Sequence, residues 1–185
     1  EIEYRLYVPN SYRADTASPL IVLLHGLGGT PRIIEYDGIR EEAEQHGYIV
    51  VAPYGYNKRG WYGLFGPGKS FFNEGPDGPT PDNIGLLSET DVINVFEMVN
   101  EEFNIDPKRT YLMGHSMGGG GTMYRRIVCL GASTGEHNLV GAAMHHIGDP
   151  LPGSVQGMSC FLTHSMHAGG IPIKLAEVWK HRFQD

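Results

Sequence analysis

The stretch Tyr111-Leu-Met-Gly-His-Ser-Met-Gly-Gly-Gly-Gly121 decides the predicted fold. Within it, Gly114, Ser116 and Gly118 form the pattern G-x-S-x-G. Residues 110–113 are β-branched or apolar, as in a buried strand, and the residues after the pattern can form a helix. A serine hydroxyl stands above a sheet only where strand turns sharply into helix, and such a turn leaves room only for glycine on either side. The pattern therefore predicts a nucleophilic serine, with a glycine-rich turn of no chemical role as the alternative.

A second glycine-rich segment, His25-Gly-Leu-Gly-Gly29, follows the apolar run of residues 20–24. Such a run favours a central parallel strand. Acyl transfer needs backbone N–H donors aimed at the developing oxyanion, and glycines let the backbone approach closely. One donor would be the residue after the serine, Met117, and the other would come from this early loop, for which we select Leu27. The alternative is that the loop is merely a tight turn.

Length and composition limit the classes of protein to consider. The 185 residues suit a single domain spanning residues 1–185, and the formal charge of −7 argues against nucleic acid as a partner. No apolar run is long enough to cross a bilayer, so no membrane partner is expected. Location stays open between the cytoplasm and secretion after removal of a signal segment. Cys129 and Cys160 could pair or stay reduced, and their number decides nothing.

The first half of the chain alternates strands with a helix. Apolar residues at every second position predict a half-buried strand over residues 2–8. A helix is expected from Thr30 to a stop at Gly47, with Tyr36, Ile39 and Ala43 on its buried face. Residues 48–52 form the next buried strand. This order is typical of an α/β sheet.

Residues 53–86 form a long loop rich in glycine, proline, asparagine and aspartate. A loop of this length inside a compact domain is often functional. Its aromatic residues include Trp61, Tyr62, Phe65, Phe71 and Phe72. These five could contact an apolar acyl group or a ring, or they could fold back as a local plug.

The same loop matches a nucleotide-binding pattern, Gly63-x₄-Gly68-Lys69-Ser70. A P-loop needs a strand before it and a helix after it, so that helix N-terminal amides hold the phosphate. Residues 71–79 contain prolines and glycines that cannot sustain this helix. The match is therefore interpreted as fortuitous.

A helix is predicted to begin at Ser88, because Ser88 and Asp91 resemble a capping box. Its apolar residues recur at helical spacing and should face the core. After a turn at residues 106–107 comes the strand that carries the serine motif. Later elements are a strand at 139–144, a strand at 158–163 and a closing helix near 175–179. The predicted apolar stripe consists of Val92, Val95, Phe96, Val99 and Phe103.

With these motifs the chain resembles α/β-hydrolases, in particular the esterase branch that includes feruloyl esterases and polyhydroxybutyrate depolymerases. The matching segments lie between residues 1 and 122 and include residues 23–29, 50–53, 60–63, 104–107 and 111–119. The resemblance implies an α/β fold with a mainly parallel sheet flanked by helices. It also implies a serine carboxylesterase with an acyl-enzyme on Ser116, and no dissociable cofactor.

The resemblance is incomplete after the serine motif. The family's acid would follow the strand at 158–163, where this chain carries Ala168, and the family's histidine would lie beyond a further strand that the 185 residues do not contain. We therefore expect a fold shortened at its C-terminal end. His145, His146 and His167, with Asp149 nearby, could form a rebuilt base, bind zinc, or lie in loops without chemistry. His164 is a further candidate for the missing triad partners. A metal site is not among our predictions.

Two functions remain as hypotheses. The first is a serine esterase acting on a small-molecule or polymeric carboxylic ester of short acyl, aryl or polyester type. The second is a catalytically impaired hydrolase-fold fragment or ligand-binding domain without the triad acid and histidine. A missing terminal strand would leave an exposed sheet edge, through which the chain could form a homodimer.

Overall fold

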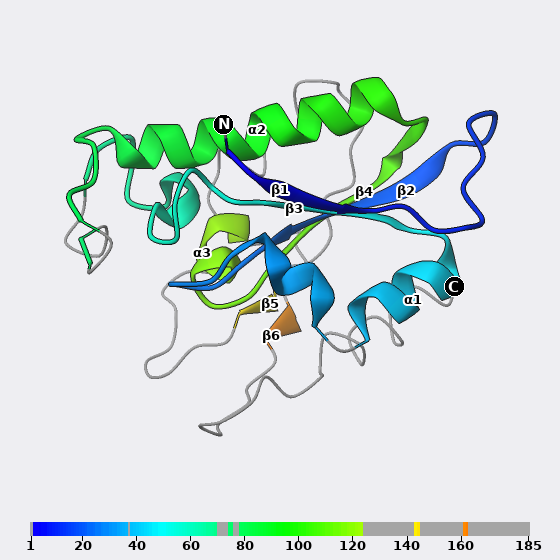
Figure 1. Ribbon diagram of the computed structural model, residues 1–185, viewed down its shortest axis with the longest axis horizontal. Coiled ribbons are helices and arrows are strands. Elements are labelled where there is room, and N and C mark those ends of the chain that lie inside the picture. The colour runs from blue at the N-terminus through cyan, green and yellow to red at the C-terminus, as the bar shows by residue number, and fades with distance from the viewer. Residues whose placement is uncertain are drawn as a thin grey trace.

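The computed structural model describes residues 2–36, 38–69, 74–75, 78–123, 143–144 and 161–162. Within these residues the main sheet has four strands, in the order β1-β3-β2-β4 (Figure 1). β2 is parallel to β3 and to β4, and β1 is antiparallel to β3. A short parallel pair, β5 and β6, lies near α3 and β4. The strands are β1 (Tyr4–Tyr7), β2 (Ser18–Leu24), β3 (Ile49–Pro53), β4 (Ile105–Gly114), β5 (Ala143–Met144) and β6 (Phe161–Leu162).

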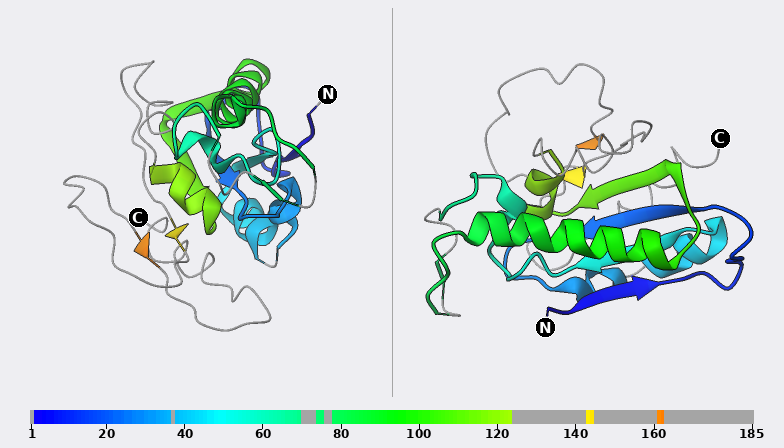
Figure 2. Two further views of the ribbon diagram at one scale, coloured as in Figure 1. Left: turned by 90° about the vertical axis from the view of Figure 1, so that its left-hand side faces the viewer. Right: turned by 90° about the horizontal axis from the view of Figure 1, so that it is seen from above.

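Helices cover both faces of this sheet, which gives three layers (Figures 1 and 2). The long helix α2 (Ile84–Glu102) lies along the strands on one face, and the short helices η1 (Pro31–Glu35) and α1 (Ile39–His46) cover the other. Alternate residues of β2 point to opposite faces, so Leu20, Val22 and Leu24 join the α2 layer while Ile21 and Leu23 join the α1 layer. Because β2 is buried on both sides, it reads as a continuous apolar run.

The helix predicted between Thr30 and Gly47 is divided in two. Thr30 caps η1, accepting the Arg32 N–H through its hydroxyl, and Gly47 ends α1 as predicted. Between them, Gly38 has a left-handed φ of 88° and begins a new helix. Tyr36 is extended and 41% exposed, so its predicted place on the buried face was wrong.

The helix predicted to start at Ser88 begins four residues earlier, at Ile84. Ser88 and Asp91 are therefore interior residues of α2, both buried, and not a capping box. Their polar atoms accept hydrogen bonds from a distant loop, described below. The predicted apolar stripe is buried at Val92, Val95, Phe96 and Val99, while Phe103 lies just after the helix and is partly buried against the core.

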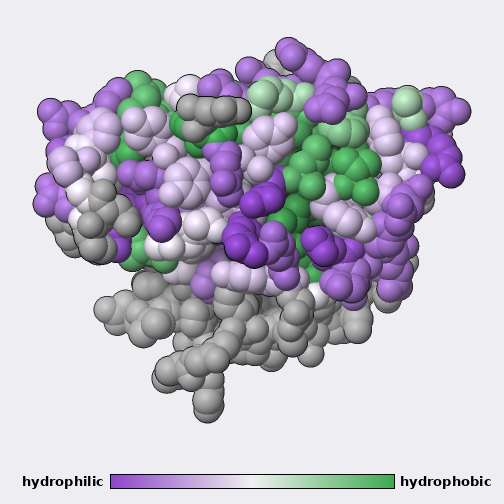
Figure 3. Space-filling view, viewed as in Figure 1, coloured by the Kyte–Doolittle hydropathy of each residue, from purple (hydrophilic) through white to green (hydrophobic). Residues whose placement is uncertain are grey.

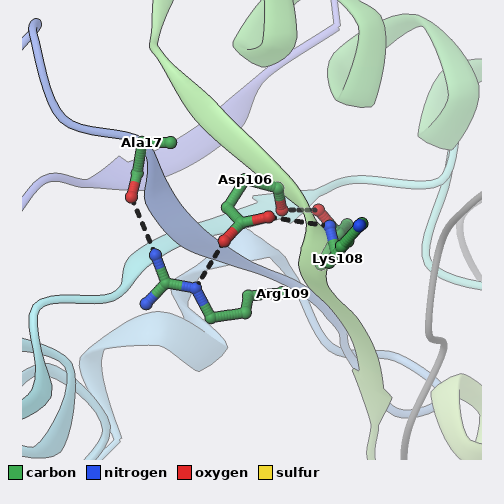
Figure 4. Close-up of polar contacts among 5 residues, drawn as sticks. Ala17, Asp106, Lys108 and Arg109 are labelled. Atoms are coloured by element: carbon green, nitrogen blue, oxygen red, sulfur yellow. Dashed lines mark hydrogen bonds and ion pairs between the residues drawn. The ribbon is translucent and has the colours of Figure 1, made fainter.

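The turn predicted at residues 106–107 is an irregular start of β4, shown in Figure 4. Asp106 accepts the backbone N–H of Lys108 at 2.9 Å and Nε of Arg109 at 2.7 Å. Arg109 Nη2 also donates to the Ala17 carbonyl at 2.8 Å, and the β2–β4 register shifts between Ser18 and Leu20. This cluster ties the first residues of β4 to those leading into β2.

The surface seen from the same side as Figure 1 is mostly hydrophilic, with a hydrophobic band between α2 and α1 (Figure 3). Within the described part of the chain, no helix has the length and apolar character needed to cross a membrane.

Several predictions fall wholly or partly outside the described residues. They include the continuation of the helix after Met123, most of the two later strands, the closing helix, both cysteines and the terminal sheet edge proposed for a homodimer.

Candidate active site

Ser116 lies at the junction between β4 and α3 (Met117–Met123), at the carboxyl end of the strand. Its φ of 53° is in the left-handed region, which residues other than glycine seldom adopt. The residue is partly exposed, while Met117 and the glycines after it are buried. This strand-to-helix turn with a strained serine is the geometry predicted from the G-x-S-x-G pattern.

Two glycines allow this turn by close backbone contact. A Cβ atom on Gly118 would collide with the carbonyl groups of Leu24 and His25, and one on Gly114 would collide with the Gly118 backbone. The atoms in the way are backbone atoms, which cannot move aside as a flexible side chain can. The glycine at 114 is therefore required by the tightness of the turn itself, and the glycine at 118 by packing against the end of β2.

The turn also contacts the loop predicted to hold the oxyanion donor. The backbone N–H of His115 donates to the Leu24 carbonyl at 3.0 Å. The His115 ring lies against Gly26, where an added Cβ would be 2.8 Å from Nδ1. Leu27 follows with a 45% exposed side chain, and Gly28 has a left-handed φ of 75°. The structure thus brings the loop carrying Leu27 against the turn carrying Ser116 and Met117.

His25 is buried and connects this loop to the end of β3. Its Nδ1 lies 2.8 Å from the Gly26 carbonyl oxygen, and its Nε2 lies 2.9 Å from that of Tyr54. A neutral imidazole can donate to only one of the two carbonyls, whereas a protonated ring can donate to both. Burial nevertheless lowers the pKa of His25, and the two carbonyl contacts oppose that effect.

The aromatic residues of the 53–86 loop have two different environments. Tyr62 is fully buried and donates its hydroxyl to the His25 carbonyl at 3.1 Å, and this burial raises its pKa well above the ordinary value. Phe65 is 49% exposed and meets the ring of Trp61 edge-on at 5.1 Å. Tyr62 is therefore a plug, whereas Phe65 is at the surface. The other two aromatic residues, Phe71 and Phe72, lie outside the described residues.

A hollow of about 330 Å³ lies next to Thr30, the residue that follows the 25–29 loop. Its walls come from the residues before β1, the residues after β3, and Thr30; they are Ile2, Glu3, Thr30, Tyr54 and Tyr56. Because β1 runs antiparallel to β3, its first residues lie at the same sheet edge as the last residues of β3. The hollow therefore opens at the carboxyl edge, where ligands of α/β sheets bind.

The nucleotide-binding pattern does not have the structure of a P-loop in its described part. Gly63 ends a single turn of 3₁₀ helix, η2 (Trp61–Gly63), where a strand would be needed. Lys69 pairs with Asp82, its Nζ lying 3.2 Å from Oδ1. Ser70 lies outside the described residues.

We expect ATP with magnesium to leave the melting temperature of the protein unchanged. Lys69 is already paired with Asp82, and the Gly85 and Leu86 amides at the start of α2 already donate to the Gly68 and Pro67 carbonyls. A ligand present at 100 times its dissociation constant would stabilise the fold by about 2.7 kcal/mol, which a thermal melt detects readily. A shift of that size, lost on Lys69→Ala, would show that the loop binds nucleotide after all.

The residues considered as acid, base or zinc ligand lie outside the described residues; they are His145, His146, Asp149, His164 and His167, and Ala168 lies there too. Among the described residues, no group of three or more histidine, cysteine, aspartate or glutamate side chains is arranged to hold a metal ion.

Comparison with known proteins identifies a family. The family model Esterase, described as "Putative esterase", matches residues 1–126. The S-formylglutathione hydrolase of Rattus norvegicus is 30% identical over 152 residues, which cover 77% of this chain and 51% of that protein. Feruloyl esterase B of Neurospora crassa is 33% identical over 118 residues, which cover 61% of this chain and 35% of that protein.

A solved S-formylglutathione hydrolase from Agrobacterium tumefaciens has a similar fold, with a TM-score of 0.51 at 19% identity over 77% of this chain and 51% of that one. The chain thus spans about half the length of the S-formylglutathione hydrolases that it matches. The family match and the structural likeness agree with the resemblance drawn from the motifs. The chain belongs to this esterase family, and its described part has the α/β-hydrolase fold.

Proposed function

We propose that this chain carries the nucleophile and the oxyanion hole of a serine carboxylesterase. The observation that supports this most directly is the left-handed backbone of Ser116, held at the carboxyl edge of the sheet against the end of β2. In the proposed reaction Ser116 Oγ attacks the ester carbonyl carbon, and the Leu27 and Met117 amides donate to the developing oxyanion. Both amides belong to segments that contact one another at the turn.

The chemistry proceeds through an acyl-enzyme. The bond from Ser116 Oγ to the acyl carbon forms, the bond from that carbon to the leaving oxygen breaks, and the alcohol leaves with a proton. Water then hydrolyses the acyl-serine. A base must take the serine proton, and the candidates are the four histidines at 145, 146, 164 and 167. Because Ala168 stands where the resemblance places the acid, we propose that turnover is below the ordinary enzyme median of about 10 s⁻¹.

The substrate class proposed is a carboxylic ester with a short acyl, aryl or polyester acyl group. The names of the relatives include a thioester hydrolase and a feruloyl esterase, which agree on an activated acyl carbonyl as the reacting group. The exposed Phe65 packs edge-on against Trp61, which lies beside Gly120 of α3, and the hollow lined by tyrosines is at the same carboxyl edge of the sheet. No dissociable cofactor takes part in this mechanism.

We expect a serine-directed alkyl fluorophosphonate to modify Ser116 and no other residue. The reaction forms a bond from Oγ to phosphorus and releases fluoride, and it responds to the same oxyanion donors as ester hydrolysis. Peptide mass spectrometry would locate the adduct, and p-nitrophenyl acetate would compete for labelling.

An adduct on a different serine would show that Ser116 is not the nucleophile. Complete absence of labelling, together with ester hydrolysis no faster than in buffer, would instead support the second hypothesis, a hydrolase-fold domain that has lost its chemistry. Binding of an uncleaved ester analogue would then identify a ligand-binding domain.

A further inference from the structure

The loop that carries Leu27 is held by the segment that follows β3, residues 54–62. Three hydrogen bonds connect the two. The Tyr54 carbonyl meets His25 Nε2 at 2.9 Å, the Lys58 carbonyl accepts the Gly28 N–H at 2.9 Å, and Tyr62 donates its hydroxyl to the His25 carbonyl at 3.1 Å. These contacts lie on both sides of Leu27, so the 54–62 segment sets the direction of its amide.

The 54–62 segment is itself in an unfavourable conformation. Gly55 and Tyr56 have left-handed φ values of 67° and 66°, and Trp61 and Tyr62 have values of 56° and 52°. Three of these four residues are large aromatic ones, for which left-handed backbone is a strained state. Strained backbone persists only where the surrounding structure determines it. The segment therefore needs an anchor outside itself.

Two polar side chains of α2 provide this anchor. Asp91 Oδ2 accepts the N–H of Gly55 at 2.7 Å and that of Tyr56 at 3.2 Å, which fixes the first left-handed pair. Ser88 Oγ accepts the N–H of Tyr62 at 3.1 Å, which fixes the second. Residues three apart share one face of a helix, so both anchors point to the same side of α2.

Because Asp91 is buried, its carboxylate depends on the hydrogen bonds from Gly55 and Tyr56. Asp91 is 8% exposed, and burial raises the pKa of its carboxyl group while the two backbone N–H donors act in the opposite direction. A buried carboxylate is costly unless its oxygens are hydrogen-bonded. Its loss would leave the buried Gly55 N–H and the partly buried Tyr56 N–H unpaired, beside backbone that is already strained at Tyr56. The segment would then shift, and the loop bonded to it would shift as well.

We infer that Asp91 is a positioning residue for the oxyanion hole, acting through the 54–62 segment on the Leu27 amide. This inference rests on the proposed esterase function, in which that amide binds the oxyanion. The chain of contacts runs from Asp91 to Gly55 and Tyr56, then to Tyr54, Lys58 and Tyr62, and finally to His25 and Gly28.

The test compares Asp91→Ala with Asp91→Asn and with Val99→Ala. The asparagine variant can keep one oxygen in the place of Oδ2, which accepts both N–H groups, so it should rescue most of the effect. Val99 is a buried core residue further along the same helix, so its alanine variant destabilises α2 without touching the 54–62 segment. Thermal melts would confirm that all three variants are folded at the assay temperature.

Two measurements separate positioning from simple loss of stability. For p-nitrophenyl acetate, Asp91→Ala should lower kcat by about 10²-fold with KM changed by less than about threefold, because a misplaced oxyanion donor acts on the transition state. Amide hydrogen exchange of residues 25–29 should be faster in Asp91→Ala by about tenfold or more, because the opening that exposes these amides needs less free energy. Asp91→Asn should lie close to the parent protein, and Val99→Ala should show neither change.

The inference is overturned if exchange of residues 25–29 is the same in Asp91→Ala as in the parent, or if Val99→Ala gives an equal loss of kcat. If the parent protein neither hydrolyses esters nor reacts with a fluorophosphonate, the proposed function is rejected. Faster exchange of residues 25–29 in Asp91→Ala would still support the structural link between Asp91 and this loop. The two ideas can therefore fail separately.

Discussion

Replacing Ser116 by alanine is expected to abolish fluorophosphonate labelling and to remove most of the ester hydrolysis. In the proposed reaction the Ser116 hydroxyl oxygen forms the acyl bond, and alanine has no nucleophilic atom at that position. In a complete serine triad, loss of the nucleophile lowers kcat by about 10⁶-fold, and the rate that remains comes from binding and the oxyanion hole. Initial rates on p-nitrophenyl acetate measure this directly, and a variant retaining a tenth of the parental rate would reject Ser116 as nucleophile.

A glycine at the same position provides a matched control. Ser116→Gly should be as inactive as Ser116→Ala, yet more stable, because residue 116 has a φ of 53° that suits glycine. The difference in the free energy of unfolding should be about 1 kcal/mol in favour of glycine, since a left-handed backbone costs other residues about 1–2 kcal/mol. Urea denaturation of the two variants would show it. Equal stability would mean that the serine backbone is not strained in solution.

Gly118→Ala is expected to be strongly destabilising. The new Cβ would overlap the Leu24 carbonyl group and press on the His25 carbonyl. Leu24 ends the central strand, which is paired on both sides, so it cannot retreat. We expect a loss of about 3 kcal/mol or more in the free energy of unfolding, at the upper end of the range for overpacking, together with loss of labelling at Ser116.

Gly120→Ala is the control for this experiment. It adds the same methyl group to the same helix, but the nearest atom, at 2.8 Å, is Cδ2 of Leu64, the free end of a flexible side chain. Alanine is also better than glycine in a helix by about 1 kcal/mol, which offsets the crowding. The stability of Gly120→Ala should therefore stay within about 1 kcal/mol of the parent. A similar loss in both variants would mean that the helix, and not the contact with Leu24, determines the effect.

The parts of the fold that depend on neighbours in sequence were predictable. The run of residues 20–24 became β2, buried along its whole length, and the apolar strand before the serine motif became the end of β4. The left-handed serine between two glycines follows from the same local pattern. Each of these features is determined within a few residues, where spacing and residue type are sufficient evidence.

The support around the site could not be predicted in this way. A serine three residues before an aspartate is equally compatible with a helix start and with the interior of a helix. Ser88 and Asp91 lie in the interior of α2, where their hydrogen-bond partners are Tyr62 and Gly55 of the loop. These partners are 26 and 36 residues away in the sequence, so no local pattern reveals them. The run of glycines after Ser116 was one sequence signal that a bulky side chain packs against α3. In the structure that side chain is Tyr62, which lies against Gly121.

The order of the strands has a consequence for how the molecule assembles. Leu20 pairs with Ile49 on one side and with Thr110 on the other, so the chain closes a loop of about 30 residues for the first pairing and about 90 for the second. The longer closure costs about 1 kcal/mol more in chain entropy. The geometry of Ser116 depends on contacts with Leu24 that exist only after this second closure. A nascent chain emerging from the ribosome therefore carries an ordinary, unstrained serine until β4 has docked beside β2.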